Sequence, residues 1–127
     1  MGRRRSVVAA TAFVATVMGA FGSLIAAEGT LTAAKQSCVV PEYKSSCSVE
    51  ITWSTVGQVK DETYVLSDTP ELNTLIAKGD AGSATVPVLY PSRTFYLYNN
   101  ETLLAKTLVR ATCAPGTAWV GTRCMVP

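Results

Sequence analysis

The chain contains no histidine among its 127 residues. Histidine is the commonest general base, the usual partner of a nucleophilic serine or cysteine, and the commonest metal ligand, so its absence excludes most familiar active sites. The four cysteines also lack a Cys-x-x-Cys spacing, which disfavours a zinc site. We therefore expect no enzymatic activity, no metal and no cofactor.

A cluster of basic residues is also missing beyond the N-terminus. The formal net charge is +2, but three of the 11 basic residues are Arg3, Arg4 and Arg5, which leaves eight basic against nine acidic residues in the rest. Those eight are spread singly along the chain, whereas nucleic-acid binding requires a basic stripe. Nucleic acid is therefore not an expected partner.

What the chain does have at its start is the pattern of a targeting segment. The three arginines are followed by an uncharged, largely apolar stretch over residues 7–27. This pattern is typical of an export signal, and the stretch is also long enough to cross a bilayer as a helix. Small residues near its end favour a cleaved signal peptide over an N-terminal membrane anchor. Both alternatives predict a secreted or cell-surface protein that contacts a membrane only through residues 1–27.

The remaining residues show the period-2 alternation of β-strands rather than a long helical period. Residues 28–36 are small and polar, which predicts a linker before a β domain over 37–112 and a disulfide-closed C-terminal segment over 113–127. Within the β domain, single strands are expected over 47–54, 62–67 and 83–89. A β-hairpin is expected with arms over 93–98 and 102–112.

Two segments carry additional signals. Pro87 lies within the strand predicted over 83–89 and indicates an edge strand or a bulge. Leu72, Leu75 and Ile76 have helix-like spacing, so residues 71–78 predict a short helical turn or an irregular edge. Short strands at regular spacing favour an antiparallel β-sandwich of about seven strands over a small barrel.

Three stretches carry a resemblance to a known class of domain. They are Cys38 and Cys47 followed by Val49-x-Ile51-x-Trp53, the run from Ser92 to Asn100 with the nearby Leu103-Leu104-Ala105, and the run from Ala111 to Cys124. Together they resemble bacterial exported immunoglobulin-like domains with a cysteine-closed ending. The resemblance implies an immunoglobulin-like sandwich without catalytic residues. Trp53 departs from the antibody pattern, because it follows Cys47 by only six residues.

The four cysteines of an exported chain imply a disulfide framework with three possible connectivities. We favour Cys38 with Cys47 and Cys113 with Cys124, because each pair brackets a short loop that contains turn-forming residues. The rival bond between Cys47 and Cys113 would join two sheets in the immunoglobulin manner.

The aromatic residues supply the candidate core and the candidate binding residues. Trp53 shares one strand face with Val49 and Ile51, which predicts a core anchor. Phe95 and Leu97 are expected inside the core, so that Tyr96 and Tyr98 lie exposed on the opposite face of the same strand. Trp119 either caps the sandwich or faces a ligand. The candidate ligand contacts are Trp119, Tyr96 and Tyr98.

These features favour a non-enzymatic extracellular or cell-surface module with a structural or adhesive binding role, whose partner is a protein or a surface polymer. The alternative is a small carbohydrate-binding module that uses the exposed aromatic residues. A hydrolase built on paired carboxylates ranks behind both.

Overall fold

The structure is a computed structural model, and it describes residues 26–127. Residues 1–25 of the predicted targeting segment lie outside the described residues. Within the described part, no helix is long and apolar enough to cross a membrane.

The described residues form an all-β fold. The strands are β2 (Glu28–Ala33), β3 (Ser37–Val40), β4 (Ser46–Val56), β5 (Thr63–Ser67), β6 (Thr74–Lys78), β7 (Ala81–Leu89), β8 (Ser92–Asn99), β9 (Thr102–Cys113), β10 (Ala118–Val120) and β11 (Arg123–Met125).

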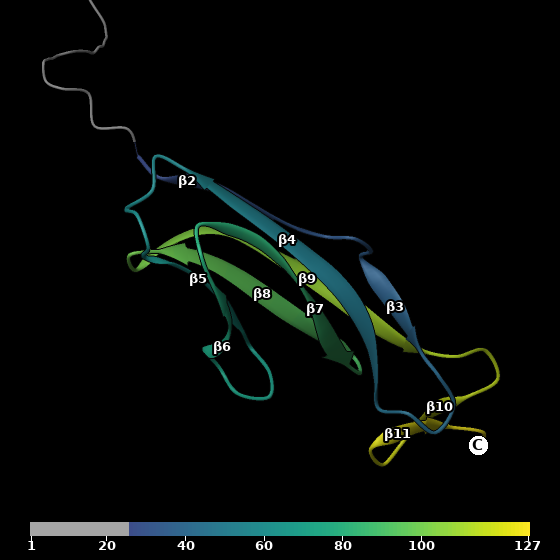
Figure 1. The fold of residues 1–127 in the computed structure, drawn as a ribbon. Coiled ribbons are helices and arrows are strands. Elements are labelled where there is room, and N and C mark those ends of the chain that lie inside the picture. The colour runs from purple at the N-terminus through teal and green to yellow at the C-terminus, as the bar shows by residue number, and fades with distance from the viewer. Residues whose placement is uncertain (1–25) are drawn as a thin grey trace, which may run out of the picture.

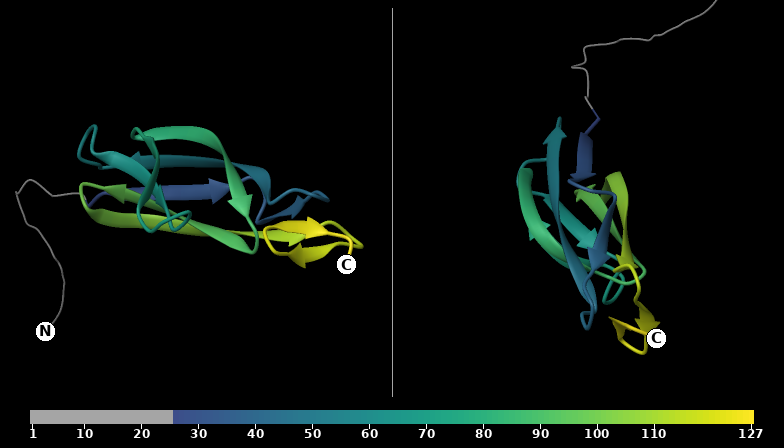
Figure 2. Two further views of the ribbon diagram at one scale, coloured as in Figure 1. Left: turned by 90° about the horizontal axis from the view of Figure 1, so that it is seen from below. Right: turned by 90° about the vertical axis from the view of Figure 1, so that its right-hand side faces the viewer.

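These strands make two main sheets and a small hairpin (Figure 1). One sheet has the order β2-β4-β7, and the other has the order β3-β9-β8-β5-β6. Every pairing is antiparallel except that of β3 with β9, which is parallel. The hairpin β10-β11 lies at one end of the long axis, and the start of β2 lies at the other (Figures 1 and 2).

The core lies between the two main sheets, as in a β-sandwich. On β4 every second side chain is buried, including Val49, Ile51 and Trp53, because alternate residues of a strand point to the same face. The five-stranded sheet contributes Val65, Phe95, Leu97 and Val109, all with no exposed surface. The core-anchor prediction for Trp53, Phe95 and Leu97 agrees with this burial.

The strand predictions are largely confirmed. The segments expected over 47–54 and 62–67 are β4 and β5, and the expected hairpin is β8-β9. The segment around Pro87 is β7, which lies at the edge of the three-stranded sheet as the proline indicated.

Residues 28–33, expected in a linker, instead form strand β2. This strand pairs with β4 from Glu28↔Val56 to Ala33↔Ile51 and buries Leu31. A glycine is needed at position 29 because β2 closely approaches the opposite sheet there: an added Cβ at Gly29 would lie 2.7 Å from Leu97 Cδ2. The glycine that suggested a linker therefore reflects tight packing.

Of the two alternatives for residues 71–78, the short helical turn is wrong and the irregular edge is confirmed, because residues 74–78 form the edge strand β6. A β-bulge between Val65 and Leu66 shifts the register of β5 against β6. The shift lets the adjacent Ile76 and Ala77 both pack against the core while Leu75 points outward. The helix-like spacing of Leu72, Leu75 and Ile76 therefore arises from the irregular spacing of apolar side chains on a bulged edge strand.

Two disulfides link Cys38 to Cys47 and Cys113 to Cys124, in agreement with the favoured connectivity. The first bond does more than close a short loop. Cys38 lies on β3 of the five-stranded sheet and Cys47 lies on β4 of the three-stranded sheet, so this local disulfide joins the two sheets. The rival bond between Cys47 and Cys113 is absent.

We predict that Gly29→Ala lowers the free energy of unfolding by about 1–3 kcal/mol, because the new methyl group must displace the fully buried Leu97. Urea unfolding measures the change. Thr32→Ala, at an exposed position of the same strand, is the matched control and should change stability by less than about 0.5 kcal/mol. Equal effects of the two substitutions would contradict close packing of β2.

Candidate functional site

The outward face of the five-stranded sheet carries a group of tyrosine and leucine side chains, here called the tyrosine face. Inside this sheet Phe95 and Leu97 are fully buried, so alternation places Tyr96 and Tyr98 outside. The strand register arranges the outward residues in two rows across four strands. The first row is Lys78, Tyr64, Tyr98 and Leu103, and the second is Leu75, Leu66, Tyr96 and Lys106.

The tyrosine face is largely apolar, with a partly exposed centre and more exposed margins. Tyr64 and Tyr98 stack with ring centroids 5.6 Å apart and nearly parallel planes. The two leucines at opposite margins, Leu75 and Leu103, are 52% and 46% exposed.

The charges of the tyrosine face are all positive. Its two rows contain Lys78 and Lys106, at opposite edges, and no aspartate or glutamate. The carboxylate of Asp68 lies at the margin, where its Oδ1 accepts a hydrogen bond from the Thr94 amide at 3.0 Å.

A second group of aromatic and basic residues surrounds the β10-β11 hairpin. The Cys113–Cys124 disulfide ties the hairpin to β9. Two backbone hydrogen bonds tie it to the β3-β4 loop: the Tyr43 amide donates to the Cys124 carbonyl at 2.7 Å, and the Cys124 amide donates to the Lys44 carbonyl at 2.9 Å. The hairpin is therefore fixed on two sides.

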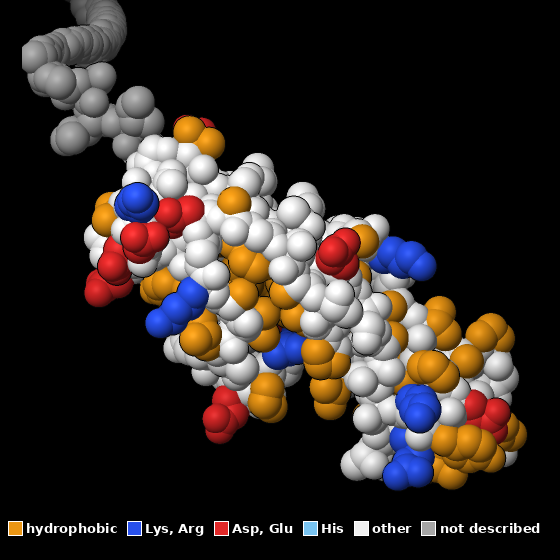
Figure 3. Space-filling model, viewed as in Figure 1, with side chains coloured by type: hydrophobic (Ala, Val, Ile, Leu, Met, Phe, Trp, Pro, Cys, Tyr) orange, Lys and Arg blue, Asp and Glu red, His pale blue; other side chains and the backbone are white. Residues whose placement is uncertain are grey.

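An open hollow of about 350 Å³, here called the hairpin hollow, lies beside these contacts. Trp119 lines it and stacks on Tyr90 with centroids 4.8 Å apart. Hydrophobic, basic and acidic side chains gather at this end of the molecule (Figure 3). The lining residues are Tyr43, Lys44, Ser45, Leu89, Trp119, Thr122 and Arg123.

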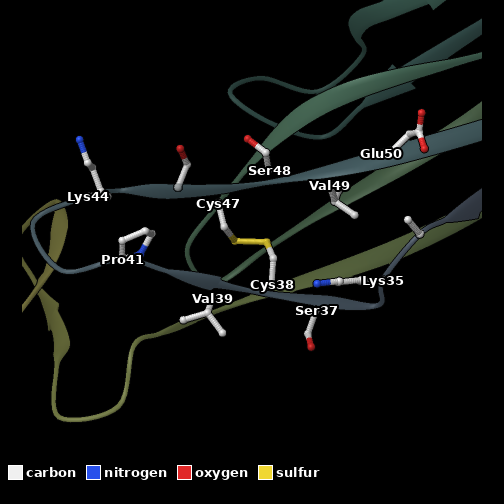
Figure 4. Close-up of a pocket in the computed structure, with 12 residues that line it drawn as sticks. Lys35, Ser37, Cys38, Val39, Pro41, Lys44, Cys47, Ser48, Val49 and Glu50 are labelled. Carbon is white, nitrogen blue, oxygen red and sulfur yellow. A yellow bond between two sulfur atoms is a disulfide. The ribbon is translucent and has the colours of Figure 1, made fainter.

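A larger hollow of about 650 Å³ lies between β3 and β4, where the Cys38–Cys47 disulfide crosses from one strand to the other (Figure 4). Its charged side chains are Lys35, Lys44 and Glu50, and the rest of its lining is serine, small apolar residues and the disulfide. This composition offers no pair of groups arranged for acid-base chemistry.

Arg93 is a buried charge, with 5% of its surface exposed, and its contacts assign it a structural role. Nε donates to Ser67 Oγ at 2.6 Å, Nη1 to the Pro87 carbonyl at 2.7 Å, and Nη2 to the Thr69 carbonyl at 2.7 Å. The guanidinium also lies 5.3 Å from the Phe95 ring centroid. Burial lowers the pKa of Arg93, and nearby Asp68 opposes this effect. Arg93 thus links the two sheets by satisfying backbone carbonyls.

At the opposite end from the hairpin, Asn99 and Asp80 hold the loop between β4 and β5. Asn99 is 2% exposed and exchanges hydrogen bonds with the backbone of Val59, and it also donates to Thr63 Oγ1. Asp80 Oδ2 accepts from the Asp61 amide at 3.2 Å. The Thr63 side chain and the Asp61 amide lower the pKa of Asp80. No group of three or more potential metal ligands occurs within residues 26–127.

The three candidate ligand contacts do not form one site. Tyr96 and Tyr98 lie on the tyrosine face, whereas Trp119 lies in the hairpin hollow with Tyr90. The sequence reasoning missed their partners. Tyr64 could have been found from the outward alternation of residues 62–67, but Tyr43 and Tyr90 lie in loops and carried no periodic signal.

Comparison with known proteins assigns no family: no protein-family model, no curated protein and no solved structure matches the chain.

We predict that Arg93→Lys lowers the free energy of unfolding by about 2–3 kcal/mol, because an ammonium group cannot reproduce the three separate hydrogen bonds of the guanidinium fork. Urea unfolding at neutral pH measures the loss. Arg110→Lys, at an exposed position of β9, is the matched control. If the two substitutions cost the same, the linking role of Arg93 is wrong.

Asp80 predicts a pH dependence of stability. Its pKa is lower in the folded than in the unfolded chain, so its contribution is present above the unfolded pKa of about 4 and is lost as the pH falls through the folded pKa. The difference in unfolding free energy between wild type and Asp80→Asn should therefore shrink as the pH falls below about 4. A difference that stays constant over this range would contradict the assignment.

Proposed function

We propose that this chain is a non-enzymatic, exported module with an adhesive or structural role, and that it binds a protein partner through the tyrosine face. The observation that carries the proposal is the pair of tyrosine and leucine rows across β6, β5, β8 and β9. Monomeric soluble proteins rarely expose a large contiguous apolar patch unless it is used for binding.

The composition of this face supports a protein partner. Tyrosine is enriched at protein interfaces because it buries a large area with few rotatable bonds, and its hydroxyl group tolerates water before binding. The two lysines occupy the ends of the rows, where a polar rim would surround an apolar centre. The scaffold beneath is rigid, because Val65, Phe95 and Leu97 are fully buried.

The strand order supports an immunoglobulin-like sandwich as the finer description of the fold. The first two strands belong to different sheets, because β2 pairs with β4 and β3 pairs in parallel with β9. The remaining strands follow an order of the Greek-key type. The inter-sheet disulfide joins β3 to β4 instead of the two strands that antibody domains use.

The two disulfides support export, because such bonds form and persist in oxidising compartments. Together with the basic and apolar N-terminal segment, they favour a location outside the cytoplasm.

The test is an adhesion assay in which beads carry the purified full-length chain. The number of beads that attach to cells that produce the protein is counted. Tyr98→Ser combined with Leu103→Ser should lower bead attachment at least tenfold, because removing central apolar contacts costs more than 1.4 kcal/mol of binding free energy. Leu72→Ser is the matched control, since Leu72 is 78% exposed in the loop before β6 and outside the tyrosine face.

Thermal unfolding of each variant shows whether the fold is retained. Undiminished attachment of the folded double variant, or an equal loss with Leu72→Ser, would mean that the tyrosine face is not the binding surface.

A further inference from the structure

The hairpin hollow is distinct from the tyrosine face and has its own aromatic surface. One face of the Trp119 indole is covered by Tyr90, which holds the ring in a fixed orientation beside the hollow. Tyr43 lies in the lining and is 59% exposed. A volume of about 350 Å³ is at the small end of the range for ligand pockets, which is about 300–1,000 Å³.

The charges in the hairpin hollow are positive. Lys44 and Arg123 line it, and no aspartate or glutamate does. Glu42 is adjacent to Tyr43 in sequence but is not part of the lining. Arg123 can hold a carboxylate through two parallel hydrogen bonds, and Lys44 supplies a second cation. The hollow therefore suits a small ligand that carries a negative charge.

The backbone around Tyr43 is held in a conformation that its side chain does not favour. The Lys44 amide donates to the Pro41 carbonyl at 3.0 Å, which closes a turn with Tyr43 as its third residue. Tyr43 has φ of 68°, a value that favours glycine or asparagine at this position. Strained residues of this kind are concentrated at binding and catalytic sites. Among the five non-glycine residues with positive φ in the described part, Tyr43 is the one that lines the hairpin hollow.

We propose that the hairpin hollow binds a uronic acid unit of an acidic polysaccharide. The C–H face of a pyranose ring stacks on Trp119 and Tyr43, while its carboxylate pairs with Arg123 and Lys44. The hydroxyl groups of Ser45 and Thr122 lie in the same lining and can bond to sugar hydroxyls. This site is additional to the proposed function of the tyrosine face.

The geometry favours a sugar over an acidic peptide. An extended peptide typically binds by pairing with a free strand edge, where backbone hydrogen bonds supply the affinity. In this hollow, the backbone amides of Tyr43 and Cys124 already donate within the protein. The accessible groups are rings, cations and hydroxyls, which together match a charged sugar ring.

The test is an NMR titration of the full-length chain with trigalacturonate, followed through the indole N–H signals of its two tryptophans. Trp119 lines the hollow, whereas Trp53 is 3% exposed and donates its indole proton to the Gly79 carbonyl in the core. We expect a saturable shift of the Trp119 signal and an unchanged Trp53 signal. The methyl ester of the trimer, which lacks the charges, should bind at least tenfold more weakly.

Variants locate the site. Arg123→Gln should weaken binding about tenfold, and Lys60→Gln, an exposed cation in the loop between β4 and β5, should leave it unchanged. Tyr43→Gly should weaken binding without lowering the melting temperature, because glycine suits the φ of this position. If Tyr43→Gly loses binding while its fold is intact, Tyr43 contacts the ligand and is not required for the structure.

Four results would overturn the proposal. They are equal binding of the trimer and its ester, a shift of Trp53 as large as that of Trp119, displacement of the trimer by inorganic phosphate at the same concentration, and equally tight binding of a glutamate oligopeptide. The third would identify a simple anion site, and the fourth would identify an acidic protein as the partner.

Discussion

Between Ala33 and Ser37 the chain leaves the three-stranded sheet and joins the five-stranded sheet. β2 therefore completes the sheet of β4, and β3 completes the sheet of β9 in parallel. The Cys38–Cys47 disulfide follows this crossing directly and links the two sheets covalently. The crossing also brings the β3-β4 loop to the β10-β11 hairpin, where Tyr43 and Lys44 bond to Cys124. Both the sandwich and the hairpin hollow depend on it.

Much of the fold could be predicted from the sequence, because a half-buried strand alternates apolar and polar side chains. This rule identified β4 from Val49, Ile51 and Trp53, and it placed Phe95 inside. It failed at β2, where Gly29 allows close approach to the opposite sheet, and at β6, where a bulge breaks the alternation. Both failures come from tertiary contacts that no local window contains.

The candidate surfaces could be predicted only in part, for the same reason. Alternation along β8 placed Tyr96 and Tyr98 outside, but the stacking of Tyr98 on Tyr64 depends on the register between β8 and β5. The sequence predicted that Trp119 either caps the sandwich or faces a ligand. Its neighbours Tyr43 and Tyr90 come from two distant loops, which only the folded chain brings together.

The position of the strand ends also has a mechanical consequence. The start of β2 and the β10-β11 hairpin lie at opposite ends of the long axis (Figure 1), so a tensile force between them runs along the strands. Such a force shears the β2-β4 and β3-β9 ladders, and the hydrogen bonds within each ladder share the load rather than breaking one after another. The two disulfides keep the loops of residues 39–46 and 114–123 from extending.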